Sequence, residues 1–490
     1  MKTDKHSVDF NKILSFDLEL TRDEKLRHMG AVLAERTLSL KINQDEAIHQ
    51  LDEMAGDADL ILGHNILDHD LPWIAKQRVR AQILLDKPII DTLYLSPLAF
   101  PANPYHRLIK DYKLVRDSIN DPVNDAKLSL QVFTEQICAL QEKPLAQLQL
   151  YQYLFEHGVA SHFSTRGMAS IFSALTGQAS ISAVVLPTLV KSVAQNKACP
   201  NQLNRVIGDA LKQPLRLLPL AFACAWLPVS GGNSVLPPWI WRRFPVTADI
   251  IRELREQKCQ SETCRYCCEN HDARRHLQKI FELNDFRKLP DGSPLQRNIV
   301  EYGLASRSLL GILPTSGGKS LCYQLPAIVR NLRNGSLTIV ISPLQALMKD
   351  QVDNLRHKAG IKGVEAISGM LTLPERGAIL EQVRKGDIAI LYLSPEQLRN
   401  RAVKQAIKQR QISGWVFDEA HCLSKWGHDF RPDYLYCGKV IESLAQEQSV
   451  QIPPVFCYTA TAKLDVINDI CRYFDKKLSH PLARFSGGVE

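Results

Sequence analysis

The sequence predicts a multidomain α/β protein, and three observations support this. Two regions, residues 10–140 and 283–490, alternate short β-rich runs with helical segments, which is the pattern of α/β layers. Residues 141–282 between them show Leu/Ala/Gln-rich helical periodicity and end in a cysteine cluster. The chain has 490 residues, more than one hydrophobic core normally organises. We therefore expect three domains with these boundaries.

Composition narrows the class of protein. With 45% hydrophobic and 23% charged residues, the chain should fold into a large core. No run approaches the roughly 18 apolar residues of a membrane span, and the polar start lacks a signal peptide, so we expect a cytoplasmic protein without a membrane partner. A net charge of +8 agrees with a polyanionic partner but predicts little by itself. Twelve cysteines in this context indicate reduced thiols and one metal site.

The first α/β region carries carboxylates suited to divalent metal ions. In ILSFDLEL, Asp17 and Glu19 share one face of a strand, because alternate residues of a strand point the same way. Asp70 follows a Gly-His-Asn turn, and Asp125 lies at the start of a helix in NDPVNDAKLSLQVF. This order of elements resembles the DnaQ-like, or DEDD, 3′–5′ exonuclease family. The resemblance implies an RNase H-like fold in which the four carboxylates bind two Mg²⁺ or Mn²⁺ ions.

The general base of that family is the departure. Members with a histidine base carry it five residues before the last aspartate, where this chain has Asn120, and members with tyrosine carry it four before, where it has Asp121. An amide cannot accept the proton of the attacking water. His106 or Asp121 would have to substitute. The alternative is a nuclease fold kept for binding DNA or for scaffolding.

The cysteine cluster has the spacing of a metal site. In KCQSETCRYCCENHDARRH, Cys259, Cys264 and Cys267 follow C-x4-C-x2-C, with Cys268 and His271 next. Three thiolates and the His271 imidazole would complete a tetrahedral zinc site, and the same spacing suits an iron–sulfur cluster. We expect zinc from Cys259, Cys264, Cys267 and His271, bracing the connector. Reduced surface thiols are the plain alternative.

The third region contains a phosphate-binding pattern. LLGILPTSGGKSLCYQ places a glycine pair and Lys319-Ser320 after an apolar strand and before a helix. In that context Lys319 can reach the β- and γ-phosphates of a nucleotide and Ser320 can bind Mg²⁺. Leu313 stands where the strict pattern has glycine, so an ordinary Gly-rich turn is the alternative.

A second motif supplies acidic residues. The strand GWVF runs into Asp418-Glu419-Ala420-His421, which places two carboxylates at the carboxyl end of a strand. One can hold Mg²⁺ through water while the other orients the attacking water. Two like charges this close are costly unless they share a cation. A solvated acidic turn is the alternative.

The motifs together resemble the RecQ family of superfamily 2 DNA helicases. PTSGGKSLCYQLPA, SPLQALMKDQVDNL, LYLSPEQL, DEAHCLSKWGHDFRPDY and YTATA occur in family order. The resemblance implies a RecA-like fold that binds and hydrolyses MgATP through Lys319, Ser320, Asp418 and Glu419. Further residues that it implies are Gln296 at adenine with Phe286 and Arg287 nearby, the loop residues Thr315, Ser316, Gly317 and Gly318, and the coupling residues His421, Thr459 and Thr461. An extra stretch, KLPDGS, separates Arg287 from the segment of Gln296.

The segment Ser424–Tyr434 resembles the aromatic-rich loop by which this family senses single strands. Aromatic faces stack on any base, and an arginine can reach a phosphate. The expected DNA-binding residues are Trp426, His428, Phe430, Arg431 and Lys349. A buried aromatic cluster is the alternative. We expect Trp426→Ala to uncouple ATP hydrolysis from single-stranded DNA.

The chain ends some thirty residues after YTATA. RecA-like motors hydrolyse ATP between two lobes, and the second supplies an arginine finger. We therefore expect an amino-terminal portion of a longer helicase that binds ATP weakly and hydrolyses it slowly. Its expected partners are single-stranded and partly duplex DNA and a second helicase lobe. The competing hypothesis is a non-catalytic DNA-binding or recruitment platform.

Overall fold

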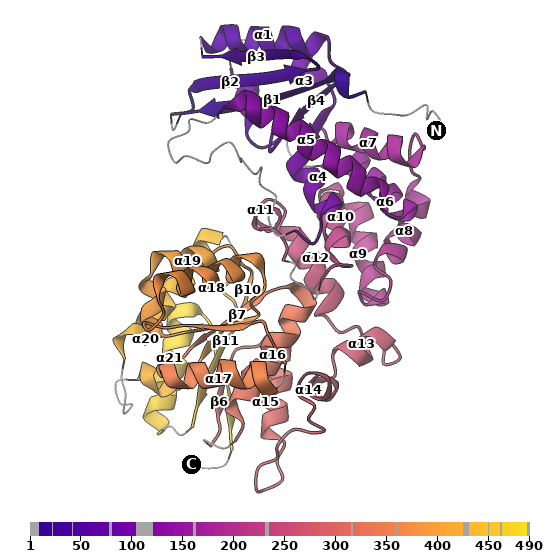
Figure 1. Cartoon of the computed structure of the whole chain (residues 1–490). Helices are drawn as coiled ribbons and strands as arrows, with labels where there is room; N and C mark the ends of the chain where they lie inside the picture. The colour runs from indigo at the N-terminus through magenta and orange to yellow at the C-terminus, as the bar shows by residue number, and fades with distance from the viewer. Residues whose placement is uncertain are drawn as a thin grey trace. The chain divides into compact units, whose positions relative to one another are not determined.

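The computed structural model describes residues 9–487 except 22, 42, 78–80, 104–120, 160–162, 231–234, 315–316, 359, 425–430, 449 and 461–462. It divides into two compact units (Figure 1). Unit 1 is Met1–Pro228 with Phe244–Ile250, and unit 2 is Val229–Arg243 with Ile251–Glu490. The helices of the predicted connector, residues 141–282, are divided between the two units.

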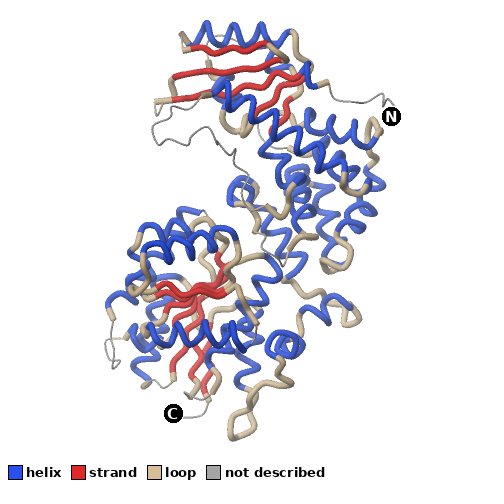
Figure 2. The backbone as a smooth tube through the Cα atoms, in the orientation of Figure 1, coloured by secondary structure: helices blue, strands red, loops and turns tan. Residues whose placement is uncertain are grey.

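Unit 1 is built on a five-stranded sheet with the order β3-β2-β1-β4-β5 (Figure 2). The strands are β1 (Ile13–Leu20), β2 (Leu26–Leu33), β3 (Arg36–Leu40), β4 (Leu60–Gly63) and β5 (Ile89–Asp91). β1, β2 and β3 form an antiparallel meander, while β4 and β5 run parallel to β1. The sheet is therefore mixed, and the carboxyl ends of β1, β4 and β5 share one edge.

Helix α5 (Pro122–Gln141) packs across β1 and β2 of this sheet. Gly30 of β2 permits the approach, because a Cβ atom there would overlap the backbone of Pro122 and Val123. Ser15 of β1 donates to the carbonyl oxygen of Ala126 at 2.8 Å and fixes the contact. The first turn of α5 is thereby held against the centre of β1.

The remaining helices of unit 1 complete its core. They are α1 (Gln44–Gly56), α2 (Asp70–Ala75), α3 (Gln82–Asp86), α4 (Thr92–Ala99), α6 (Leu145–His157), α7 (Arg166–Thr176), α8 (Leu186–Val193), α9 (Pro200–Lys212) and α10 (Leu217–Trp226). Every residue of α10 is buried, as expected for a helix that is apolar all round. The sequence predicted helices from residue 141 onward, and α6 to α10 confirm that prediction.

Unit 2 contains a seven-stranded sheet with the order β12-β6-β11-β10-β7-β9-β8, in which every pairing is parallel. The strands are β6 (Leu309–Ile312), β7 (Leu337–Ile341), β8 (Val364–Ile367), β9 (Ile390–Leu393), β10 (Ile412–Phe417), β11 (Val455–Thr459) and β12 (Ala483–Ser486). This confirms the predicted parallel α/β sheet.

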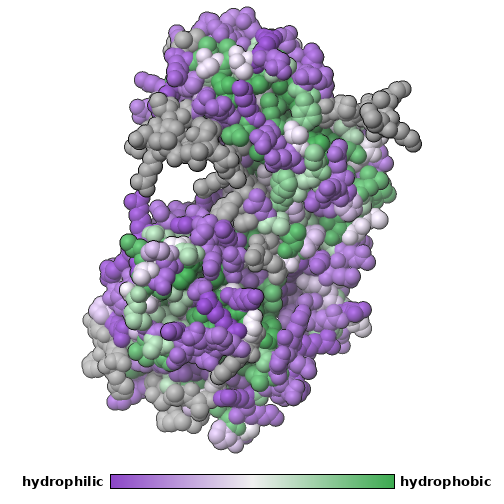
Figure 3. Space-filling model, in the orientation of Figure 1, coloured by the Kyte–Doolittle hydropathy of each residue, from purple (hydrophilic) through white to green (hydrophobic). Residues whose placement is uncertain are grey.

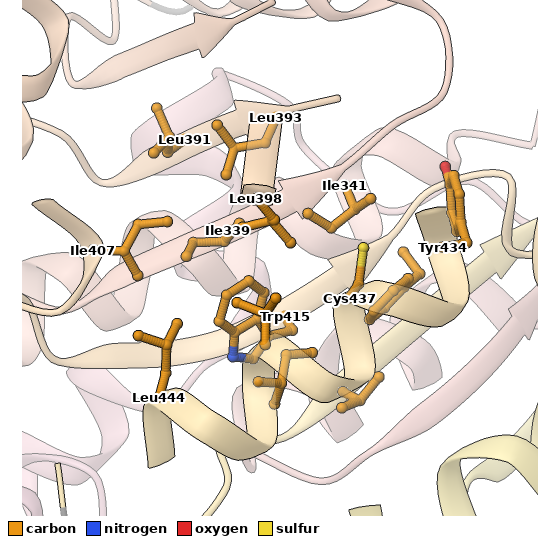
Figure 4. Close-up of a cluster of buried hydrophobic side chains, with 14 of the residues drawn as sticks. Ile339, Ile341, Leu391, Leu393, Leu398, Ile407, Trp415, Tyr434, Cys437 and Leu444 are labelled. Atoms are coloured by element: carbon orange, nitrogen blue, oxygen red, sulfur yellow. The ribbon is translucent and has the colours of Figure 1, made fainter. Parts of the chain in front are cut away.

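Helices cover both faces of that sheet, because alternate residues of each strand enter different cores. Trp415 and Phe417 of β10 belong to the cluster in Figure 4, and Val416 between them belongs to the other. The crossover helices are α16 (Lys319–Asn334), α17 (Gln345–Lys358), α18 (Leu373–Lys385), α19 (Arg401–Ile407), α20 (Pro432–Gln448) and α21 (Leu464–Leu478). The central strands β7 and β9 are buried along their whole length for this reason.

Shorter helices precede the sheet of unit 2 in the chain, and one of them, α12, is divided between the two units. The bounds are α11 (Pro238–Arg243), α12 (Pro245–Arg255), α13 (Arg265–Asn270), α14 (Ala273–Phe281) and α15 (Leu295–Leu304). Hydrophilic residues predominate on the face drawn in Figure 3, with hydrophobic residues interspersed. Among the described helices of the chain, none combines the length and apolar character that crossing a membrane requires.

Candidate nucleotide site and candidate metal sites

The carboxyl ends of three adjacent strands of unit 2 carry the nucleotide-site residues. β6, β11 and β10 are neighbours in the sheet, and the loop after β6 leads into α16, whose first residue is Lys319. The Nζ atom of Lys319 donates to Oε1 of Glu419 at 3.2 Å. The two side chains are 11% and 21% exposed, so the ion pair is largely withdrawn from water. The structure thus brings together two motifs that are 100 residues apart.

Burial and charge set the protonation of the acid pair. Burial, with the neighbouring charge of Glu419, raises the pKa of Asp418 to about 6. The pKa of Glu419 is lowered, first by a hydrogen bond with His421 and then by Lys319. Tyr434 donates its hydroxyl to the carbonyl oxygen of Asp418 at 2.9 Å and holds this turn in place. Both carboxylates are ionised at neutral pH and can attract a divalent cation.

Gln296 links the start of the motor region to the phosphate loop. Its Oε1 accepts from the backbone N–H of Arg287 at 2.8 Å, and its Nε2 donates to the carbonyl oxygen of Gly318 at 3.2 Å. Gly318 has φ +73°, and a Cβ there would overlap Gln296. The positive φ favours glycine at this position, and a larger residue would also displace the Gln296 amide. Gln296 therefore connects the backbone of Arg287 to the phosphate loop through its side-chain amide.

The two departures from the expected pattern have local explanations. Leu313, at the position of a pattern glycine, is buried in the core under the loop. The extra stretch KLPDGS closes on itself, since Leu289 bonds to both Ser293 and Gly292 through the backbone. It therefore leaves Arg287 beside Gln296. Phe286 is buried in the same core as Leu313, so its ring serves packing.

His421 connects the acid pair to strand β11. Its Nδ1 lies 3.2 Å from Oγ1 of Thr459 and 3.3 Å from Oε2 of Glu419. Hydrogen bonds to Cys422 and to Glu419 raise the pKa of His421 to about 10, so the ring is cationic at neutral pH. Thr459 is the last residue of β11, and its carbonyl oxygen accepts from Leu313. A change at Glu419 can thus reach the end of β11 through one side chain.

Several predicted residues lie outside the described part of the chain: Thr315 and Ser316 of the phosphate loop, Trp426, His428 and Phe430 of the aromatic segment, Thr461, Asn120 and His106. Of the predicted DNA-binding residues that are described, Arg431 donates to the carbonyl oxygen of Pro343 at 3.1 Å, just ahead of α17. Lys349 is exposed on α17. Ser320 follows Lys319 in the first turn of α16 and Gly317 precedes Gly318 in the loop.

In unit 1 the predicted carboxylates gather at the carboxyl end of β1. Leu18 of that strand donates its N–H to Asp70 at 3.2 Å, and α5 brings Asp125 to the same strand. Asp70 is 2% exposed, and burial raises its pKa. The Oε1 atom of Glu19 is buried without a hydrogen-bond partner. No three of these carboxylates have oxygens mutually within 4.8 Å among the described residues.

A carboxylate that sequence reasoning left without a role holds the Gly-His-Asn turn. Asp91 accepts from the backbone N–H groups of Asn65, Leu67 and Leu93 at 2.9–3.0 Å. It is fully buried, which raises its pKa to about 7. The only sequence signal was its position at the end of a strand. Asp121, the substitute base considered above, caps α5 by accepting from Val123.

The cysteine cluster forms in part as predicted. The Sγ atoms of Cys259, Cys264 and Cys267 lie within 4.8 Å of one another. The predicted ligand His271 is not in the group that could hold a metal ion. Burial lowers the pKa of His271 to about 4, and its Nε2 atom is buried without a hydrogen-bond partner.

Comparison with known proteins is consistent with this geometry. Residues 293–470 match the DEAD/DEAH box helicase family. The chain is 39% identical over 193 residues to the probable ATP-dependent DNA helicase RecS of Bacillus subtilis. The matched segment covers 39% of this chain and 36% of that protein. The chain is 35% identical over 206 residues to the ATP-dependent DNA helicase RecQ of Haemophilus influenzae, covering 42% and 30%.

A eukaryotic relative and a solved structure are also similar to part of the chain. The chain is 37% identical over 203 residues to the ATP-dependent helicase SGS1 of Saccharomyces cerevisiae, covering 40% of this chain and 14% of that protein. The yeast splicing factor Prp28 is similar in structure at TM-score 0.34 and 18% identity over 50% of this chain and 58% of that one, too little for a functional comparison. The matching segment thus spans about a third or less of these curated relatives. Residues 293–470 of this chain are therefore similar to the DEAD/DEAH box helicase domain, with RecQ-family proteins among the relatives.

Proposed function

We propose that unit 2 is the first motor lobe of a RecQ-type DNA helicase, which binds MgATP and couples its hydrolysis to movement on single-stranded DNA. The observation that carries the proposal is the ion pair of Lys319 with Glu419 beside the buried Asp418. Catalysis of phosphoryl transfer consists largely of positioning and charge stabilisation, and these three side chains supply both.

Nucleotide binding would rearrange this pair. Lys319 would leave Glu419 for the β- and γ-phosphates, and Asp418 would hold Mg²⁺ through water. Glu419, released from Lys319, would then orient the attacking water. His421 would follow Glu419 and move the end of β11 at Thr459, which couples the nucleotide to the DNA-facing segments.

A binding measurement tests the site without requiring a second lobe. We expect Lys319→Ala to weaken the affinity for a fluorescent ATP analogue with Mg²⁺ about 10- to 100-fold, because one charge-assisted contact to phosphate is lost. Lys408→Ala is the matched control, since Lys408 also pairs with a glutamate, at 2.7 Å from Glu447 and outside the site. Equal affinity of Lys319→Ala and wild type would refute the proposal.

We further propose that unit 1 is a two-metal 3′–5′ exonuclease-like domain. Its support is the convergence of Asp17 and Glu19 on β1 with Asp70 and Asp125, together with the buried, unpartnered Oε1 of Glu19. Such an oxygen is costly to bury unless a cation is bound nearby. Two ions would align a water and stabilise the leaving oxygen of the phosphodiester.

End-labelled single-stranded DNA with Mn²⁺ tests this second proposal. We expect wild type to remove 3′ nucleotides and Asp17→Ala/Glu19→Ala to lose that activity. Glu46→Ala, an exposed acid in the first turn of α1, is the control. Trimming that persists in the double variant would assign the activity to another site.

The non-catalytic platform is the competing proposal for unit 1. It is favoured by Asp121, whose carboxylate is used as a helix cap, and by the lack, among the described residues, of three carboxylates whose oxygens lie mutually within 4.8 Å. DNA binding that is unchanged in Asp17→Ala/Glu19→Ala, without 3′ trimming by wild type under Mg²⁺ or Mn²⁺, would support the platform.

A further inference from the structure

A thiol-rich loop of unit 2 lies beside the helix that begins at the phosphate loop. It runs from Cys259 to Cys264, the residue just ahead of α13, and Cys267 follows within that helix. Cys264 and Cys267 are buried, while Cys259 is partly exposed. The three Sγ atoms lie within 4.8 Å of one another. Buried thiols that converge from one short loop have the chemistry of a site for a thiophilic metal.

The spacing of the sulfur atoms distinguishes between metals. A tetrahedral zinc ion with Zn–S bonds of about 2.3 Å separates its ligand sulfurs by about 3.8 Å. In a four-iron cluster each cysteine binds a different iron atom, so the ligand sulfurs stand on a larger tetrahedron. Because all three sulfurs fall within 4.8 Å, one ion fits and a cluster does not. We propose that Cys259, Cys264 and Cys267 bind a single zinc ion as thiolates.

The surroundings of the sulfurs stabilise the thiolate form. The backbone N–H of Cys259 donates to Sγ of Cys267 at 3.4 Å. Hydrogen bonds from backbone amides are typical of metal-bound cysteine sulfur. The buried guanidinium of Arg333 lies near enough to Cys267 for an electrostatic interaction. A negatively charged zinc–thiolate centre would be partly neutralised by this cation.

The zinc ion would fasten this loop to the far end of α16. Arg333, in the last turn of α16, donates to the carbonyl oxygen of Asn270, which also lies 2.9 Å from Nε2 of His276. Asn334, the last residue of α16, donates to Glu256, just before the cysteines. Segments on both sides of the thiols are thus bonded to the helix whose first residue is Lys319. The role of the ion is structural.

Within unit 2 the sequence spacing favours His271 as a fourth ligand, and its buried Nε2 atom has no hydrogen-bond partner. His271 is not in the group of thiols whose ligand atoms already lie together. His271→Asn tests its role, because a variant that lacks a true ligand should release zinc to a weak chelator.

Elemental analysis of the purified full chain tests the proposal. We expect about one zinc per chain and no iron. A mercurial reagent should release that zinc from folded wild type, as measured with a metallochromic dye, because thiolates are the ligands. Cys264→Ser/Cys267→Ser should contain no zinc. Cys268→Ser is the matched control, since Cys268 is exposed and its Sγ contacts Glu262.

Cys264→His guards against a misfolded serine variant, because an imidazole can replace a thiolate and should retain zinc. Lys319→Ala should also keep full zinc, so failure of the nucleotide proposal is distinguishable. Zinc-free wild type, iron with absorption near 400 nm (about where iron–sulfur clusters absorb), or full zinc in Cys264→Ser/Cys267→Ser would each overturn the proposal.

Discussion

The two acidic sites of this chain differ in how their charge is balanced. In unit 2, Glu419 already has a cation, because Lys319 lies 3.2 Å away. In unit 1, the Oε1 atom of Glu19 is buried without a hydrogen-bond partner. The first site is stable without ligand and must exchange one partner for another when nucleotide binds. The second site contains a buried carboxylate oxygen that a bound cation would stabilise. Two similar carboxylate pairs in one chain can therefore respond differently to a metal ion, because only one of them already has a cationic partner.

The largest expected effect concerns Gly30, which allows α5 to pack on the sheet of unit 1. Gly30→Ala would force a Cβ against the backbone of α5, which cannot move aside, and should cost about 3 kcal/mol of unfolding free energy. It would also displace Asp125. Calorimetry of the full chain measures the loss in the unit 1 transition. Gly56→Ala, with open space around the Cβ, is the control. An unchanged transition for Gly30→Ala would show that α5 does not lie on β2.

The next effect is a pH dependence of unit 1. Asp91 has a folded pKa of about 7 against an ordinary value of 3.8, so the folded state holds this proton more tightly than the unfolded chain. Stability is therefore greatest below pH 4 for this group and falls as pH rises toward 7. Between pH 5.5 and 7 the loss should be roughly 2 kcal/mol. Urea unfolding at several pH values measures it.

Asp91→Asn supplies the control for that prediction. An amide oxygen can still accept from Asn65 or Leu67, but it does not titrate. We expect the variant to be less stable overall and to lose this part of the pH dependence. A wild-type slope that persists in Asp91→Asn would assign the titration to another group.

The smallest effects have opposite signs in the two sites. Glu419→Gln leaves Lys319 without its ion pair and should lower the melting temperature of unit 2 without ligand, by about 1–2 kcal/mol in free energy. Glu19→Gln removes the negative charge of a carboxylate whose Oε1 atom is buried without a partner, and it should stabilise unit 1 by about 1 kcal/mol. Adding Mn²⁺ should then stabilise wild-type unit 1 but not Glu19→Gln. Stability changes of the same sign in both variants would contradict the proposed difference between the two acidic sites.

Much of unit 2 could be predicted from the sequence. Strands β7 and β9 are buried on both faces and consist almost entirely of apolar residues, so they were recognisable without tertiary information. The phosphate loop was recognisable because strand, glycine pair and lysine are adjacent in the chain. The similarity to the DEAD/DEAH box helicase family and to RecQ-family relatives lies in this region. The aromatic DNA-binding segment stays a prediction.

The division of the connector between two compact units and the choice of metal ligands could not be predicted from the sequence. The boundary predicted at residue 140 falls where α5 ends, but the helices that follow belong to the same compact unit. Local periodicity says that a segment is helical and does not say which core it joins. The exonuclease-like activity of unit 1 and the cytoplasmic location also remain predictions.

The sequence by itself determined the local parts of this protein: strands, helix starts and the residue types of its motifs. These depend on neighbours within a few positions of the chain, which a single sequence displays. Only the tertiary structure decided that Lys319 and Glu419 meet and that Asp91 clamps a turn. Those contacts join segments that are far apart in sequence, and they exist because of the order in which strands pair. That order follows from the packing of the whole sheet.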